Sequence, residues 1–154
     1  MKKVTLLLVA FFAFAYVNAQ SNKEELDLMQ AAFGMEKKAM VYEFVKVDAN
    51  QKDAFWKLYD EYETARKELG KRRVDLLDKY ASEYDKLTNE SMDKMMTETI
   101  DLQKKTDALL ISYSKKIKKV TNPIVAFQFY QVESYILSGI RLSILEELPL
   151  PDLK

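Results

Sequence analysis

Two long segments of the chain carry apolar side chains at spacings of three and four residues, with charged residues between them. This spacing places the apolar side chains on one face of an α-helix, whereas a half-buried strand would alternate at every second residue. The pattern therefore predicts two long amphipathic helices. The first apolar stripe contains Phe55, Leu58, Tyr62, Ala65, Leu69, Leu76 and Tyr80, and the second contains Met92, Met95, Thr99, Leu102, Thr106, Leu109, Tyr113, Ile117 and Val120.

Capping residues mark where these helices begin. Asp48 followed three residues later by Gln51 matches a capping box, in which each side chain accepts a hydrogen bond from the backbone N–H of the other residue. From there the first helix is expected to run to about residue 84. Thr88 or Asn89 is the expected cap of the second helix, because both side chains can accept a hydrogen bond from the first turn.

A third helix follows the sequence Thr121-Asn122-Pro123. Proline suits the first helical position, so the third helix is expected from about Ile124 to Glu146, where later prolines stop it. Upstream of the first stripe, residues 23–33 and 35–44 predict two shorter helical pieces. Few glycines and prolines interrupt these segments, and the chain is rich in residues that favour helix.

Folding the two long helices back on each other about Leu87 brings their apolar stripes into register, with Tyr62 facing Tyr113. A short connection makes the helices antiparallel neighbours. We therefore predict an all-α fold: a long antiparallel helical hairpin of the coiled-coil type, a third packed helix and short N-terminal helical segments. The predicted parts are residues 20–46 as an N-terminal helical segment, 47–150 as the hairpin domain and 151–154 as a tail. The other facing pairs are Phe55 with Val120, Leu58 with Ile117, Leu69 with Thr106 and Tyr80 with Met95.

Arg72 and Arg73 interrupt the first stripe, and Asp101 lies about opposite them in this register. One interpretation is a polar contact that fixes the register or faces a ligand. The other is a partly exposed ion pair, which would contribute less than about 1 kcal/mol to stability.

The N-terminus has the pattern of an export signal. Lys2 and Lys3 precede an apolar run from Val4 to Tyr16, and Val17-Asn18-Ala19 offers small residues for a signal peptidase. The apolar run is shorter than the roughly 20 residues that a membrane-spanning helix needs. We expect residues 1–19 to be a signal peptide, and the mature chain to be periplasmic or secreted.

Composition argues against an enzyme and against a cofactor. The chain has no histidine and no cysteine, which removes the usual general base, the commonest zinc ligand and disulfides. Removal of Lys2 and Lys3 leaves 22 of the 24 basic residues against 24 acidic ones, so no strong attraction to nucleic acid is expected. Core packing explains the methionines Met92, Met95 and Met96 better than a copper site does. Ser114 and Lys118 are a weak candidate for a catalytic pair, because both are expected on an exposed helix face.

Aromatic side chains are numerous on these charged helices, and three helices cannot bury all of them. One interpretation is burial beneath the third helix or in a homodimer. The other is a binding surface, in which aromatic residues supply contact area and mixed charges supply attraction. The candidate partner-binding residues are Phe55, Trp56, Tyr59, Tyr62, Phe129 and Tyr130.

The motif Val47-Asp48-Ala49-Asn50-Gln51 is similar to the Leu-Thr-x-x-Gln motif of the Spy and CpxP exported helical-hairpin proteins of Gram-negative bacteria. It keeps the glutamine and an apolar first residue, and has Asp in place of Thr. A second copy would fall at residues 120–124, where Ile124 replaces the glutamine. The segments 55–62, 129–133 and 148–150 resemble an uncharacterised branch of such proteins. The resemblance implies an all-helical, often dimeric cradle, with chaperone activity or inhibition of a stress sensor in some members.

These observations lead to two expectations about function. The first is a periplasmic protein-binding module, chaperone-like, that holds apolar or partly unfolded segments of other proteins without a cofactor. The second is a regulatory or structural interaction protein that docks one specific envelope partner or sensor. Neither expectation involves nucleic acid or stable insertion into a membrane.

Overall fold

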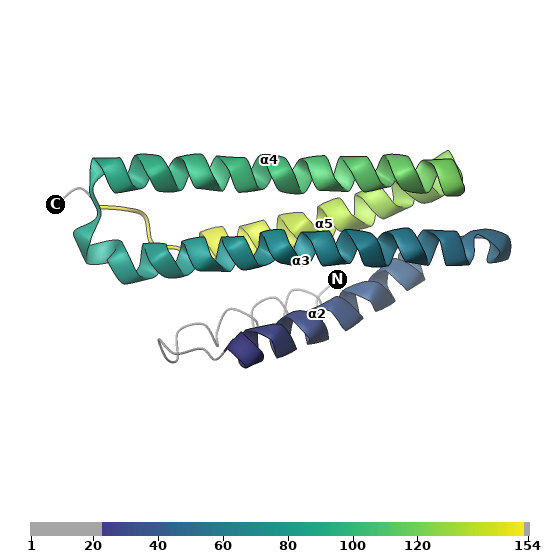
Figure 1. Cartoon of the computed structure of the whole chain (residues 1–154), viewed down its shortest axis with the longest axis horizontal. Coiled ribbons are helices and arrows are strands. Elements are labelled where there is room, and N and C mark those ends of the chain that lie inside the picture. The colour runs from purple at the N-terminus through teal and green to yellow at the C-terminus, as the bar shows by residue number, and fades with distance from the viewer. Residues whose placement is uncertain (1–22, 153–154) are drawn as a thin grey trace. The chain divides into compact units, whose positions relative to one another are not determined.

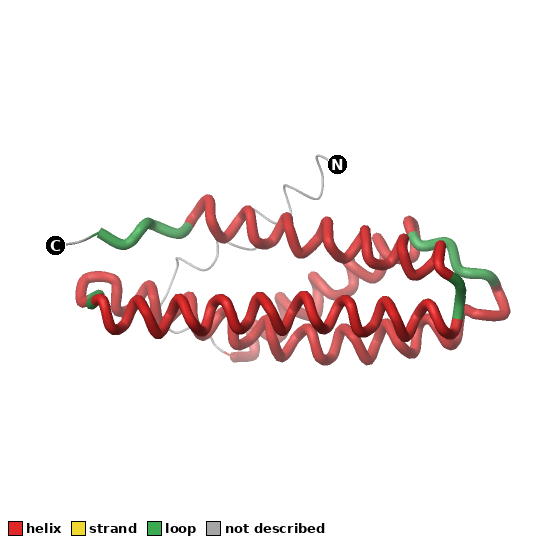
Figure 2. Tube along the Cα trace, turned by 90° about the horizontal axis from the view of Figure 1, so that it is seen from above, coloured by secondary structure: helices red, strands yellow, loops and turns green. Residues whose placement is uncertain are grey.

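The computed structural model describes residues 23–152, and within the first helix it describes side chains from Phe33 onward. Helices and short connections make up all of this part of the chain, and it contains no strand (Figure 2). The prediction of an all-α fold is confirmed. The predicted signal peptide, residues 1–19, lies outside the described residues. Helices in the described range are α2 (Lys23–Phe44), α3 (Lys52–Glu83), α4 (Asn89–Val120) and α5 (Pro123–Glu147).

Helices α3 and α4 form the predicted antiparallel hairpin and pack against each other along their length (Figure 1). The rings of Tyr62 and Tyr113 lie 5.7 Å apart in an edge-to-face arrangement, as the register of the apolar stripes requires. One position differs from the predicted stripe: Tyr59 is 1% exposed, whereas Leu58 is only partly buried. Tyr59 is buried because its ring stacks on Phe55 one turn earlier, which shifts the buried face toward these two rings.

The two predicted helix starts have different outcomes. Thr88 caps α4 in a capping box: its hydroxyl accepts from the Ser91 backbone, and the Ser91 hydroxyl accepts from the Thr88 backbone. The predicted capping box of Asp48 and Gln51 is wrong. The Asp48 side chain makes no capping hydrogen bond, because a 3-10 turn at Ala49–Gln51 comes first and α3 begins only at Lys52. The Gln51 backbone instead donates to the Asp48 carbonyl at 2.9 Å.

Helix α5 begins at Pro123, as predicted. The side-chain oxygen of Asn122 accepts hydrogen bonds from the backbone of Ile124 at 2.9 Å and of Val125 at 3.0 Å. These two donors have no carbonyl partner within the helix, so Asn122 serves as the cap. Helix α2 differs from the prediction, because one continuous helix replaces the two expected pieces. Gly34 lies within it and does not end it.

The chain divides into two compact units. One contains residues 47–126 and 150–152 of the described range, which include the α3–α4 hairpin and the start of α5. The other contains residues 23–46 and 127–149 of the described range, so most of α5 belongs with α2. From the sequence we expected 47–150 as one domain, with α5 added to the hairpin. In the hairpin unit, the Tyr84 hydroxyl donates to the Leu150 carbonyl at 2.6 Å and so attaches the C-terminal segment to the end of α3.

Candidate functional site

Most of the candidate partner-binding aromatic residues are buried. Phe55, Tyr62 and Phe129 are fully buried and Tyr59 nearly so, Trp56 is partly buried, and Tyr130 is 40% exposed. A partner could reach only Trp56 and Tyr130 without displacing other side chains. The burial of Phe55, Tyr59, Tyr62 and Phe129 favours the interpretation that these rings belong to the interior. Partner binding by the six candidate residues together stays a prediction.

The aromatic rings of α3 form a continuous cluster. Phe55 and Trp56 lie 5.1 Å apart and Trp56 and Tyr59 5.3 Å apart, both pairs edge to face. Such arrangements add stability beyond the area that the rings bury. These ring contacts lie within α3, and the contact of Tyr62 with Tyr113 joins this helix to α4.

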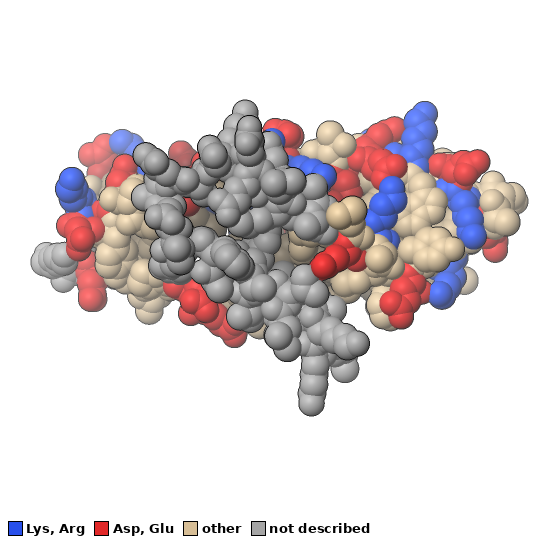
Figure 3. All heavy atoms as spheres, turned by 90° about the horizontal axis from the view of Figure 1, so that it is seen from below, with Lys and Arg blue, Asp and Glu red and all other residues tan. Residues whose placement is uncertain are grey.

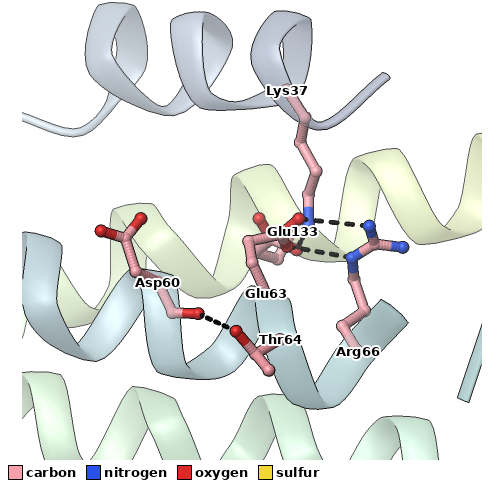
Figure 4. Close-up of polar contacts among 6 residues, drawn as sticks. All are labelled: Lys37, Asp60, Glu63, Thr64, Arg66 and Glu133. Carbon is pink, nitrogen blue, oxygen red and sulfur yellow. Dashed lines mark hydrogen bonds and ion pairs between the residues drawn. The ribbon is translucent and has the colours of Figure 1, made fainter. Parts of the chain in front are cut away.

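Polar contacts join α2 and the residue that follows it to α5, within the unit that contains α2 and most of α5. The Lys37 ammonium on α2 lies 2.7 Å from a Glu133 carboxylate oxygen on α5 (Figure 4). Both side chains are at most 1% exposed. The Lys46 backbone also donates to the Gln128 side-chain oxygen at 2.9 Å. Because residue numbers rise along α2 while they fall along α5 between these contacts, the two helices run antiparallel.

One face of α5, which we call its inner face, carries buried residues. Val125, Phe129, Glu133 and Ile136 follow at spacings of four, four and three, and each is buried. On α2, Lys37 and Val41 with the following Val45 are buried in the same way. Lys37 and Glu133 are thus buried together, and burial of a charge is costly without an opposite charge beside it.

The opposite face of α5 is also apolar, and it is exposed. We call this face the outer stripe of α5. Its positions are Ile124, Phe127, Gln131, Tyr135, Ser138, Leu142 and Leu145, which follow at spacings of three and four. The exposed fractions are 70% for Ile124, 59% for Phe127, 52% for Tyr135, 58% for Leu142 and 64% for Leu145. A helix that is apolar on both faces ordinarily has both faces covered.

A second exposed surface is the outer face of α2, which we define as Met35, Lys38 and Tyr42. Met35 is 71% exposed and Tyr42 is 64% exposed, and Lys38 lies between them on the same face. Glu36 and Glu43 flank this face along the helix. Unlike the outer stripe of α5, this surface combines apolar side chains with charges of both signs.

Charged side chains elsewhere form local pairs. The face in Figure 3 shows Lys and Arg interspersed with Asp and Glu wherever grey atoms do not cover it. Arg72 lies 3.8 Å from Asp101, with both side chains about half exposed, which agrees with the partly exposed ion pair. A hydrogen bond from Lys105 holds the pKa of Asp101 below its ordinary value, and Lys105, Arg72 and Lys104 add charge attraction. Figure 4 also shows the Arg66–Glu63 pair of α3, at 2.9 Å.

The residues with candidate chemistry are arranged as ordinary helix residues. The Ser114 hydroxyl donates to the Leu110 carbonyl at 2.8 Å, so its proton is engaged by the backbone. Met95 is buried while Met96 is 56% exposed, which places neighbouring sulfurs on different faces. Within residues 23–152, no group of acidic side chains is placed to hold a metal ion. Over the same range, no helix has the length and apolar character of a membrane span.

Sequence reasoning missed the outer stripe of α5 and the Lys37–Glu133 pair. The stripe was detectable, because the segment from Pro123 to Ile140 is apolar at nearly every turn and carries a single charge. The ion pair was not detectable, because a buried lysine looks like any surface lysine until its partner is known. Comparison with models of known protein families, with curated proteins and with solved structures gives no match. The resemblance to Spy and CpxP stays a prediction.

Proposed function

We propose that the mature chain is an exported protein-binding module that holds apolar or partly unfolded segments of other proteins without a cofactor. The observation that carries this proposal is the outer face of α2, where Met35 and Tyr42 are more than half exposed beside Lys38. Exposed apolar side chains next to charges can bind many different polypeptide segments. The apolar side chains supply contact area and the charges supply electrostatic attraction, and neither needs a shaped pocket. The export signal predicted at residues 1–19 supports a periplasmic or secreted location.

The proposal is tested with an unfolded client protein whose aggregation is followed by light scattering. The purified mature chain at an equimolar amount should delay aggregation. The variant Met35→Ser/Tyr42→Ser should lose about half of this protection or more, because a few exposed apolar residues carry most of the energy of such contacts. Both positions are exposed, so circular dichroism should report unchanged helix content.

A matched control removes exposed apolar side chains from another helix. Met96 is 56% exposed and Ile111 is 45% exposed, and both belong to α4. The variant Met96→Ser/Ile111→Ser should protect the client as well as the unsubstituted chain does. Equal losses in both double variants would contradict a role for the outer face of α2, and no protection by the unsubstituted chain would reject the chaperone-like function.

A second candidate function is the docking of one specific folded partner, such as an envelope protein or a sensor domain. The regular and uncharged outer stripe of α5 favours this alternative, because a fitted partner needs a fixed surface. Saturable binding of a single partner from an envelope extract, with no protection of unfolded clients, would support docking over client holding.

A further inference from the structure

The outer stripe of α5 lacks the charges that normally keep an exposed helix face in water. Within Pro123–Ile140 the charged residue is Glu133, which lies on the inner face and is buried. Arg141 follows beyond this range, at the side of the stripe. An exposed apolar face of this length, bordered by uncharged Gln and Ser side chains, is typical of an interface rather than of a solvated surface.

We propose that a second copy of this chain covers the outer stripe. In this arrangement α5 packs against α5 of the other copy in antiparallel orientation, about a two-fold axis that passes between Ser134 and Tyr135. Client binding at the outer face of α2 and self-association through α5 use different surfaces, so each can be tested without the other.

The order of residues along the stripe fits this axis. When the stripe is reversed about the point between Ser134 and Tyr135, six of its seven positions fall on one another, and Tyr135 falls on Ser134 beside the axis. Ile124 then faces Leu145 of the other copy, Phe127 faces Leu142, and Gln131 faces Ser138. Apolar side chains thus meet apolar ones, and an amide meets a hydroxyl that can accept its hydrogen bond. A two-fold contact requires such self-complementarity, because the same residues serve both sides.

The charges at the ends of α5 favour the antiparallel orientation. Glu146 is exposed in the last turn of α5, whereas Lys118 and Lys119 precede the start of α5 at the end of α4. Antiparallel pairing places Glu146 of one copy near the helix start and the lysines of the other, where both the charges and the helix dipole attract it. Parallel pairing would instead place the two Glu146 carboxylates together.

The exposed area is sufficient for a specific contact. Large apolar and aromatic side chains that are half or more exposed each offer on the order of 100 Å². The apolar residues of the stripe therefore offer about 500 Å² in each copy, or about 1,000 Å² in a pair. This reaches the lower bound of specific interfaces before the flanking glutamine and serine side chains are counted.

Cysteine pairs test the orientation directly, because the chain has no cysteine of its own. Gln131→Cys and Ser138→Cys replace the polar residues of the stripe and leave its apolar side chains in place. In the proposed register residues 131 and 138 of opposite copies face each other, whereas two copies of residue 131 are about 10 Å apart along the axis. Disulfides require Cα atoms within about 7 Å, so a mixture of the two variants should cross-link and each variant alone should not.

Solution mass tests the association itself. The mature chain should sediment as a dimer, and Leu142→Glu should raise the dissociation constant at least about tenfold. The matched control is Met96→Glu, because Met96 is 56% exposed and Leu142 is 58% exposed. This control should leave the dimer intact.

Three outcomes would overturn the proposal: a monomeric mature chain, equal effects of the two glutamate variants, or cross-linking of Gln131→Cys alone. None of these bears on protection of an unfolded client, which is measured with the α2 variants. Failure of self-association is thereby distinguished from failure of the proposed function.

Discussion

Lys37 and Glu133 form an ion pair that is almost completely shielded from water, with 2.7 Å between the ammonium nitrogen and a carboxylate oxygen. The pair joins α2 to α5, which are far apart in the sequence. A charge buried among apolar side chains is tolerated only when an opposite charge compensates it. The pair therefore links Lys37 of α2 to Glu133 of α5 in the folded state, whatever its net effect on stability.

Substitution of one member of this pair should cost far more than substitution of both. Lys37→Met leaves the Glu133 carboxylate buried without this compensation, and we expect a loss of about 3–5 kcal/mol in the free energy of unfolding. Glu133→Leu should cost a similar amount. The double variant should recover most of the loss, because apolar side chains can fill the same space.

Urea unfolding of the four proteins in this double-mutant cycle measures the coupling between Lys37 and Glu133. Additive losses in the double variant would show that the two residues act independently. That result would contradict the compensation argued from the short distance and the burial.

Thr88 and Asp48 make a matched comparison of helix caps. Thr88→Ala removes the side-chain cap of α4 and should lower the free energy of unfolding by about 1 kcal/mol. Asp48→Ala should have an effect near zero, because the Asp48 side chain makes no capping hydrogen bond. Denaturation midpoints of the two variants check the difference, and equal losses would be inconsistent with the caps described above.

Gly70→Ala should stabilise the hairpin. Gly70 lies in the middle of α3, and a Cβ atom added there meets no other atom within 4 Å. No other segment of the described chain approaches Gly70 closely enough to require a glycine there. Alanine should therefore raise the free energy of unfolding by about 0.5–1 kcal/mol, through its better helix propensity. Thermal unfolding followed by circular dichroism measures the change, and a lower midpoint would indicate that the glycine has another role.

Asp101 should make stability depend on pH in the acidic range. The hydrogen bond from Lys105, helped by nearby positive charges, holds the pKa of Asp101 below its ordinary value. The charged form is thus favoured in the folded state, so its contribution is present above the unfolded-state pKa and is lost as pH falls through the folded-state pKa.

Asp101→Asn removes this contribution. The variant should be less stable than the unsubstituted chain at about pH 7, and the difference should shrink toward about pH 3. Urea midpoints of both proteins at the two pH values test the sign. A difference that grows on acidification would contradict the lowered pKa.

The α3–α4 hairpin could be predicted because its determinants are local. Apolar residues at helical spacing, Thr88 at a helix start and the short connection after it together specify two antiparallel helices in one register, and Tyr62 does meet Tyr113. Pro123 likewise marks the start of α5 by its own backbone geometry. Such features act within a few residues, so they are readable without knowing what packs on them.

The candidate binding surface could be predicted only in part. Phe129 and Tyr130 are neighbours in the sequence, yet Phe129 is fully buried and Tyr130 is 40% exposed, because adjacent helix residues point about 100° apart. The aromatic character of these positions is evident from the sequence. Which of them a partner can reach depends on how α5 is packed in the folded protein.

The sequence by itself determined the helices, their approximate ends and the register of the hairpin, because these follow from periodicity and capping. Only the tertiary structure decided that Lys37 is buried against Glu133, that α2 is one helix and that one apolar face of α5 is left exposed. Burial is a relation between segments distant in the chain. No local sequence pattern specifies burial, because the same lysine or leucine can lie on a buried or an exposed helix face until the neighbouring segment is in place.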